Sequence, residues 1–399
     1  MGLMKLKKSY LLFSACVGAQ VFAQDTIRDT IQETIEIGIK EEPKKEVSYP
    51  KFKLGGVFQA RFLNNFKKGV DVNGLEHTTG RSVNNTFEVK RMRVSLNAKL
   101  SENLEVNTLV NFADFKSDPK TKVLENAFAK YTVNRYLQLQ IGQFRPAFGL
   151  EDAYAVDIVK SLDFSNSYYL MGSNGWQSFQ IGAAASGNVD LGKVPLYYAV
   201  TVTNGNGKNT LDDDNGKHYS GRFYFLIDKT KNFQLGFSSG IGEEKEKKIY
   251  AFAVEGTYRL DLTPNWALDF QAEGFQATNQ VLYFSDLAKL NPEEGSSNDL
   301  RINDYILKGF YVMPNLRYEV GKKHFQALEL SLRYEYLDAS TKINSNPRQT
   351  WTPMVSLEFL KNYGARIQLG VQIDNYKKNI INTKTYNSSL GFVQFQCRL

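Results

Sequence analysis

Closely spaced basic residues give this sequence its clearest chemical potential. Arg91 and Arg93 are separated by one residue, so in a β-strand both side chains point to one face, about 7 Å apart. Met92 and Val94 would then lie on the opposite, apolar face. Guanidinium groups bind phosphate and carboxylate through paired hydrogen bonds. The pair therefore predicts an anion contact on the polar face of a strand.

Catalytic and metal chemistry find less support. His77, His218 and His324 fall in different predicted loops or turns, so we expect no shared metal site or catalytic triad. The segment 212–216, Asp-Asp-Asp-Asn-Gly, has the acidic-to-glycine spacing of a calcium loop but lacks the distal glutamate. Calcium binding and a solvated surface loop both stay open there. We expect no catalytic residues, no metal and no cofactor, and hence no enzyme.

The first 23 residues are typical of a secretory signal peptide. Lys5, Lys7 and Lys8 precede an apolar stretch at 10–17, which is shorter than the roughly 20 residues of a membrane-spanning helix. Small residues precede Gln24, so we expect cleavage after Ala23. A lipoprotein signal with Cys16 as the lipidated residue is the alternative.

Removing that segment lowers the formal net charge from +7 to +4, because three lysines leave with it. Such a mild surplus does not argue for a nucleic-acid partner. One cysteine, Cys397, would remain, so no internal disulfide is expected. The 24–50 segment that follows has Ile27, Ile31, Ile35 and Ile39 at every fourth position. A short periplasmic helix and a polar linker both fit that spacing.

From residue 51 to the C-terminus at residue 399 the apolar residues alternate with polar ones. The segments run to nine or more residues, the length a tilted strand needs to cross a bilayer. This pattern predicts an all-β fold, a transmembrane antiparallel β-barrel of about 16 strands. The expected strands are 53–65, 86–100, 104–114, 123–133, 136–144, 176–186, 194–203, 219–228, 232–241, 249–260, 265–279, 304–321, 325–338, 350–361, 363–376 and 387–399.

The connections between these strands also alternate. They are mostly short after even-numbered strands, as at 101–103 and 134–135, and longer after odd-numbered ones, as at 66–85 and 145–175. Outer-membrane barrels have short periplasmic turns and longer outer loops. Aromatic residues near strand ends would form the interfacial girdles: Phe66, Tyr131, Tyr136, Trp176, Trp266, Tyr318, Phe325, Trp351, Phe359 and Tyr363.

The 87–152 region resembles the phosphate-selective porin O and P family. The similarity lies in Lys-Arg-Met-Arg-Val-Ser-Leu at 90–96, Asn-Phe-Ala-Asp-Phe at 111–115, and Gly-Gln-Phe-Arg-Pro-Ala-Phe-Gly at 142–149. The Asn-Gly-Asn-Gly at 204–207, followed by Gly221-Arg222, is similar as well. The resemblance implies a homotrimer of sixteen-stranded barrels in outer-membrane lipid, with the third loop folded into each lumen.

In this sequence the third loop is 145–175, and its apolar content favours packing against the lumen wall. Phe148, Leu162 and Phe164 are too apolar to extend into water. A loop inside the lumen narrows it, so charged loop residues would stand where solutes pass closest. The candidates for this constriction are Arg145, Glu151, Asp152, Asp157, Lys160 and Asp163.

The polar faces of the strands predict a lumen of mixed charge. Rings of basic residues favour anions, and the basic residues expected to line the pore are Arg61, Arg91, Arg93, Lys99, Arg222, Arg317, Arg333 and Arg366. Acidic residues expected to point inward are Glu255, Asp269, Glu273, Glu319, Glu329, Glu335, Glu358 and Asp374. This mixture departs from a purely basic ladder.

The leading hypothesis is a passive diffusion channel for small hydrophilic solutes, with phosphate or other anions as candidate cargo. The alternative is a non-conducting outer-membrane barrel that acts as a receptor or adhesin.

Overall fold

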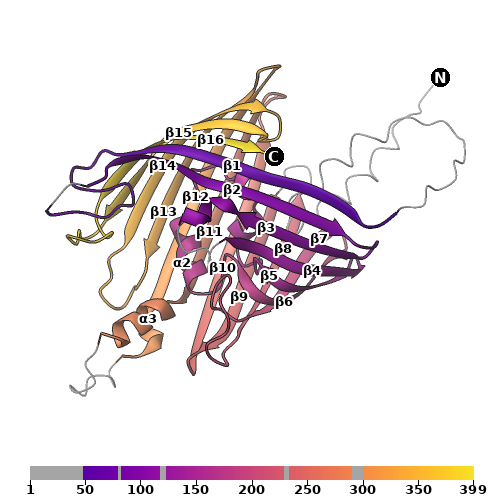
Figure 1. The fold of residues 1–399 in the computed structure, drawn as a ribbon, viewed down its shortest axis with the longest axis horizontal. Helices are drawn as coiled ribbons and strands as arrows, with labels where there is room; N and C mark the ends of the chain where they lie inside the picture. The colour runs from indigo at the N-terminus through magenta and orange to yellow at the C-terminus, as the bar shows by residue number, and fades with distance from the viewer. Residues whose placement is uncertain (1–47, 80–81, 117–122, 229–232, 290–299) are drawn as a thin grey trace, which may run out of the picture.

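Sixteen antiparallel strands close into one barrel in the computed structural model, which describes residues 48–79, 82–116, 123–228, 233–289 and 300–399 (Figure 1). Each strand pairs with its neighbours in sequence, and β1 pairs with β16 to close the ring. The strands are β1 Lys51–Asn65, β2 Asn85–Lys99, β3 Leu104–Asn111, β4 Leu124–Asn134, β5 Leu137–Phe144, β6 Gln180–Leu191, β7 Val194–Thr203, β8 His218–Asp228, β9 Phe233–Glu244, β10 Lys247–Asp261, β11 Trp266–Thr278, β12 Ile306–Lys322, β13 Phe325–Asp338, β14 Arg348–Leu360, β15 Ala365–Tyr376 and β16 Ser388–Arg398. The all-β transmembrane barrel expected from the alternation is confirmed.

Burial along the strands is the reverse of that in a water-soluble protein. On β13, Leu330 and Leu332 are 44% and 38% exposed, whereas Glu329 and Arg333 are 1% and 2% exposed. An apolar outer face and a polar inner face are what a barrel surrounded by lipid requires. At the closing seam the register places Gln59 of β1 opposite Gln396 of β16, and their amides are 2.7 Å apart. The seam is therefore paired through side chains as well as backbone.

Short turns lie at one end of the barrel and longer connections mostly at the other. The β9–β10 connection is the exception, because Lys245 and Glu246 alone join the strands, with φ angles of 47° and 65°. Such paired positive φ values are characteristic of a tight hairpin turn. The sequence predicted a break from 242 to 248 instead. The charged residues there belong to the projecting tip of a long hairpin, and the strand-ends predicted at 241 and 249 were wrong.

Four other details differ from expectation. The strand expected from 176 begins only at Gln180, and β3 ends at Asn111 because the short helix η1, Phe112–Lys116, follows it. Trp176 is 1% exposed inside the barrel, so it is not a girdle residue. Tyr363 also points inward, since its hydroxyl is 3.1 Å from Glu329 Oε1. Outer-face aromatic pairs do occur, as between Trp266 and Tyr318, whose ring centroids are 4.6 Å apart.

The connection between β5 and β6 lies within the ring of strands and holds three short helices: η2 Glu151–Ala153, η3 Val156–Ile158 and α2 Asn166–Ser173 (Figure 1). We call residues 145–179 the lumen loop. A further helix, α3 Gln280–Leu287, lies at the long-loop end of the barrel, with η6 Ile302–Asp304 after it. In the described part of the chain, no helix is long and apolar enough to cross a bilayer. The expected signal peptide and most of the 24–50 segment lie outside the described residues.

Candidate functional site: the lumen and its loop

The lumen loop begins at a point where only glycine fits. Gly149 has a φ of +73°, and a Cβ there would lie 2.1 Å from Glu273 Oε1 of β11. This close approach lets the Gly149 amide donate to Ser238 Oγ at 3.0 Å and the Leu150 amide donate to Glu273 Oε1 at 3.1 Å. Ser238 lies on β9, so two strands of one wall hold the start of the loop.

Apolar side chains near both ends of the loop pack against the same wall. Phe148 and Trp176 are each 1% exposed and pack into a cluster with β10 and β11. The wall residues in that cluster include Ile249, Ala251, Ala253, Phe275 and Ala277. Here the inner face of the barrel is apolar, and the loop buries it. Full burial of a large apolar side chain contributes about 1.5–3 kcal/mol, so this packing anchors the loop.

The middle of the loop crosses to the opposite wall. Asp157 pairs with Arg398 of β16, and the Val159 carbonyl accepts from Arg366 of β15 at 2.8 Å. Leu162 packs into a second apolar cluster with Leu63 of β1, Met354 of β14 and Phe392 of β16. The contacts to β10 and β11 and the contacts to β15 and β16 lie on opposite sides of the barrel, so the loop spans the lumen.

Asp163 is the residue that joins the loop to β1 and β2. Its carboxylate is 2.7 Å from Arg91 Nη2, 3.4 Å from Lys90 Nζ and 4.0 Å from Arg61 Nη1. Burial alone would raise the pKa of Asp163, but Arg91, Lys90 and Arg61 hold it well below its usual value. The carboxylate is therefore charged at neutral pH, and it neutralises part of a three-cation cluster.

Both Lys90 and Arg91 reach Asp163 because β2 contains a bulge. The register shifts between Gln59 and Ala60 of β1, which pair with Arg91 and Val89, so Lys90 is the extra residue. A bulge inserts one unpaired residue and changes the direction of side chains around it. Strict alternation had placed Lys90 on the outer face, so the sequence reasoning missed it.

All seven arginines expected to line the pore point inward, but each already has a bonding partner within the protein. Six of them form ion pairs, and the side chains of these six are at most 13% exposed. The seventh, Arg366, is 1% exposed. Arg93 is 2.6 Å from Glu125, and Arg317 lies 3.1 Å from Glu329 and 2.6 Å from Glu358. The other pairings are Arg61 with Glu88, Arg222 with Glu255, Arg333 with Glu335, and Arg366 with the Val159 carbonyl.

The loop residues expected at a constriction are likewise engaged. Lys160 is 2.8 Å from Asp269 of β11, and Arg145 Nη1 donates to the Tyr154 carbonyl at 2.8 Å. Burial raises the pKa of Glu151 to about 7, against the opposing effect of Arg333 and of hydrogen bonds from Ser165. Burial also raises the pKa of Asp152 to about 7. These two carboxyls therefore carry less than full charge near neutral pH.

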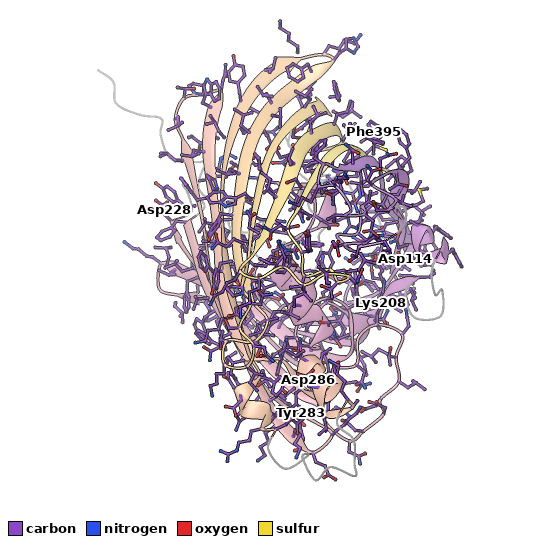
Figure 2. The ribbon with its side chains drawn as sticks, turned by 90° about the vertical axis from the view of Figure 1, so that its left-hand side faces the viewer. Asp114, Lys208, Asp228, Tyr283, Asp286 and Phe395 are labelled. Carbon is purple, nitrogen blue, oxygen red and sulfur yellow. The ribbon has the colours of Figure 1, made fainter. Side chains whose placement is uncertain are left out.

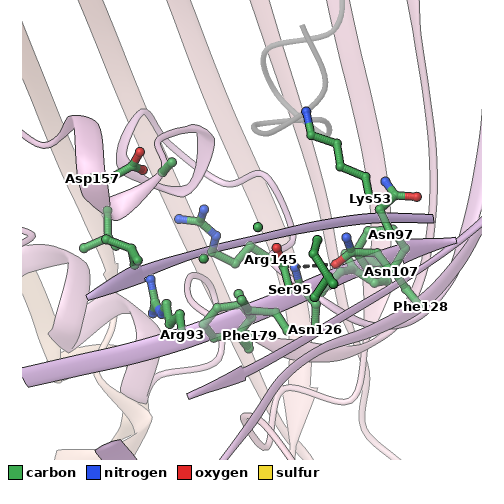
Figure 3. Close-up of a pocket in the computed structure, with 18 of the residues that line it drawn as sticks. Lys53, Arg93, Ser95, Asn97, Asn107, Asn126, Phe128, Arg145, Asp157 and Phe179 are labelled. Atoms are coloured by element: carbon green, nitrogen blue, oxygen red, sulfur yellow. Dashed lines mark hydrogen bonds between the residues drawn. The ribbon is translucent and has the colours of Figure 1, made fainter. Parts of the chain in front are cut away.

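A cavity remains between the loop and the β1–β5 wall (Figure 3). It has a volume of about 140 Å³. Polar residues from the strands line it, together with Arg145, Asp152 and Asp157 from the loop: Lys53, Arg93, Ser95, Asn97, Glu105, Asn107, Asn126, Gln140 and Arg398. Of the seven arginines expected to line the pore, Arg93 alone lines this cavity. Figure 3 shows Asn97, Asn107, Asn126 and Phe128 grouped at one end, with Arg93, Phe179 and Asp157 toward the other.

A second loop covers the rim above this wall. Lys208 is 3.4 Å from Asp114 and 3.8 Å from Glu125, and Figure 2 shows Lys208 and Asp114 close together on one flank of the barrel. The Asn209 amide donates to Gln143 Oε1 at 2.6 Å. The 204–217 loop therefore narrows the outer entrance on the same side as the cavity.

The remaining sequence candidates do not form an additional site. Asp212 pairs with Lys217, Asp213 accepts from Asn206, and Asp214 accepts from the Gly216 and Lys245 amides. Asp212 and Asp213 therefore bond within their own loop, and Asp214 also joins it to the β9–β10 turn. Among the described residues, no group of three or more His, Cys, Asp or Glu could hold a metal ion. Beside this loop, His218 stacks on Trp176 with ring centroids 4.5 Å apart.

Comparison with known proteins agrees with this geometry. Residues 64–246 match the family described as phosphate-selective porin O and P. The match covers a little under half of the chain, which is therefore a porin similar to this family. No curated protein matches the sequence. The porin is an outer-membrane β-barrel. Its strands, its lumen of mixed charge and its lumen loop form a channel for small solutes.

Three solved structures with a similar fold are distant in sequence. An anion-selective porin from Comamonas acidovorans is 9% identical, with a TM-score of 0.55 over 88% of this chain and 100% of that one. The channel DcaP of Acinetobacter baumannii is 13% identical, with a TM-score of 0.54 over 88% and 97%. A loop-deletion form of OmpT from Vibrio cholerae is 10% identical, with a TM-score of 0.54 over 88% and 99%. At such low identities the similarity concerns the fold of this porin alone.

Replacing Asp163 with Asn should shift the porin toward anions. The substitution leaves Lys90 and Arg91 without their carboxylate, and breaking a buried ion pair costs about 3–5 kcal/mol. We expect the reversal potential across a salt gradient near 0.1 M to move toward anions, because charges are screened over only about 10 Å there. Asp190→Asn, which removes the exposed partner of Arg135, is the control. A shift toward cations, or equal shifts in both variants, contradicts this role of Asp163.

Proposed function

We propose that this porin is a passive, weakly selective channel whose solutes pass on the β1–β5 side of the lumen loop, with a mild preference for anions. The observation that supports this route is the polar cavity of about 140 Å³ between the loop and the β1–β5 wall. The opposite half of the lumen is occupied by apolar packing and by ion pairs such as those of Arg317 and Arg333. Solutes would have little room there.

A weak rather than a phosphate-specific preference fits the pairing of the arginines. A guanidinium that already binds a carboxylate offers a passing phosphate few free hydrogen-bond donors. Arg91 and Arg93 are held in this way by Asp163 and Glu125. Phosphate specificity would require these pairs to open, so we propose small hydrophilic solutes and anions in general as the cargo.

The mild anion preference is supported by lysines at the short-turn mouth. The register places Lys51 of β1 opposite Lys99 of β2, and Lys53 lies two residues further along β1. Lys51 and Lys99 are exposed. Positive charges this close together raise the local concentration of anions at the mouth of a channel. The sequence reasoning had included Lys99 in the lumen but missed its two neighbours.

Other features of the protein remain proposals. We propose cleavage of residues 1–23 on export, a homotrimer in outer-membrane lipid, and no enzymatic activity or nucleic-acid partner. For the trimer, the support is the resemblance and a similar OmpT structure from Vibrio cholerae described as a trimer form, which is 10% identical with a TM-score of 0.52. A receptor or adhesin that does not conduct is the alternative.

Deleting residues 156–166 tests the route and the function together. The deletion removes the contacts to Arg91, Arg333, Arg366 and Arg398, so it should widen the lumen and free cationic groups. We expect stepwise single-channel currents from the native protein and a larger conductance, with stronger anion preference, from the deletion. Deleting residues 380–385 in the last loop is the control. No stepwise current from the folded native protein would favour the receptor or adhesin.

Replacing Lys51 and Lys99 together with Gln tests the anion preference. Removing two exposed charges at the mouth should move the reversal potential toward cations at about 0.1 M salt, and the shift should vanish near 1 M, where the Debye length is about 3 Å. Lys322 and Lys323, at the β12–β13 turn, provide the matched double substitution. If both double variants behave like the native protein, the mouth lysines do not set selectivity.

A further inference from the structure

Four uncharged amide side chains line the cavity beside the lumen loop. Asn97, Asn107, Asn126 and Gln140 all face it, from β2, β3, β4 and β5. Asn126 Nδ2 donates to Asn107 Oδ1 at 3.1 Å, the contact drawn in Figure 3. This bond uses one donor and one acceptor, so Asn126 keeps its carbonyl oxygen and Asn107 keeps its NH₂ group for an occupant of the cavity.

Gln140 gives the most direct indication that something else binds here. It is only 6% exposed, yet neither Nε2 nor Oε1 has a hydrogen-bond partner among the described residues. A buried polar group without a partner is costly, so such groups are normally satisfied by water or by a ligand. The Gln140 amide therefore presents one acceptor and two donors to whatever fills the cavity.

The charged groups around the cavity are already engaged by the protein. Arg93 pairs with Glu125, Arg398 with Asp157, and Glu105 with Lys130. Arg145 donates to the Glu151 and Tyr154 carbonyls. The hydrogen-bonding groups left for a solute are consequently mostly those of neutral amides, which donate and accept in equal measure, together with Oδ2 of Asp152.

Aromatic rings complete the lining. Phe128 of β4 and Phe179 at the end of the lumen loop are 8% and 7% exposed, and both border the cavity. Small-molecule sites combine such apolar surfaces with a few polar groups that fix orientation. The two rings offer apolar faces for the C–H groups of a solute, next to the amides that would bind its hydroxyls.

We propose that this cavity binds neutral, polyhydroxylated solutes of monosaccharide size during their passage. A hydroxyl donates and accepts, which matches an amide, whereas a phosphate ion offers mainly acceptors and would leave most of the amide carbonyl oxygens without a donor. The cavity, with a volume of about 140 Å³, has room for several waters, which an entering solute would displace. This inference rests on the proposed function and names the solute class for its route.

Titration of the channel current with glucose tests the proposal. In planar bilayers, glucose bound in the cavity should reduce the ion current of the native protein saturably, whereas viscosity alone reduces it in proportion to concentration. Inorganic phosphate, added at constant ionic strength, is the parallel arm and should show no saturable block.

Gln140→Met keeps the side-chain length and removes the amide. We expect the half-saturating glucose concentration to rise about three- to tenfold, the loss typical of one or two hydrogen bonds. Gln138→Met is the matched control, since Gln138 is two residues away on the same face of β5 and does not line the cavity. If Gln140→Met fails to assemble, Asn97→Ala is the second variant and should raise the same concentration.

Three results would overturn the inference. They are a glucose effect that never saturates, a saturable block by phosphate but not by glucose, and equal changes in the Gln140 and Gln138 variants. In each of these cases the stepwise currents remain, so the proposed channel stands. The absence of any current would instead overturn the proposed function, and this inference with it.

Discussion

The need to neutralise charge inside a closed barrel determines the arrangement of this protein. Lipid on the outside forces polar side chains inward, and a buried charge is tolerated only with a partner. Asp163 meets Arg61, Lys90 and Arg91, while Arg366 and Arg333 bind carbonyl oxygens of the lumen loop. The loop thus supplies the carboxylate and carbonyl oxygens that the basic residues of the wall need, and the wall supplies the surface on which the loop packs.

This mutual dependence makes the lumen asymmetric. Apolar contacts of Phe148 and Trp176 hold the loop to β10 and β11, and its charged segment reaches β15 and β16. What stays open is the β1–β5 side, where amides replace paired charges. The weakly selective channel that we propose rests on this division, because most of the fixed charges are paired within the protein.

Much of the fold could be predicted because alternation reports directly on a two-sided wall. It identified sixteen strands and the inward direction of residues such as Arg317 and Arg333, since each stands in an unbroken strand pattern. A β-bulge interrupts the alternation, so the sequence pattern no longer predicts which face a residue occupies. The register shift between Leu109 and Val110 lies beside Glu125 and Asn126, so these two consecutive residues both face the lumen. Which carboxylate meets Arg91 depends on the loop path, and local sequence carries no signal for that.

A cross-link between the loop and the far wall tests the central claim most directly. Gln368 Nε2 of β15 lies 3.5 Å from the Ser161 carbonyl. In a Cys397→Ser background, cysteines at 161 and 368 should be joined by a short bifunctional thiol reagent in the folded barrel, with channel conductance little changed. Failure to cross-link in folded protein, or a large loss of conductance on cross-linking, would contradict a loop that spans the lumen and leaves the β1–β5 side open.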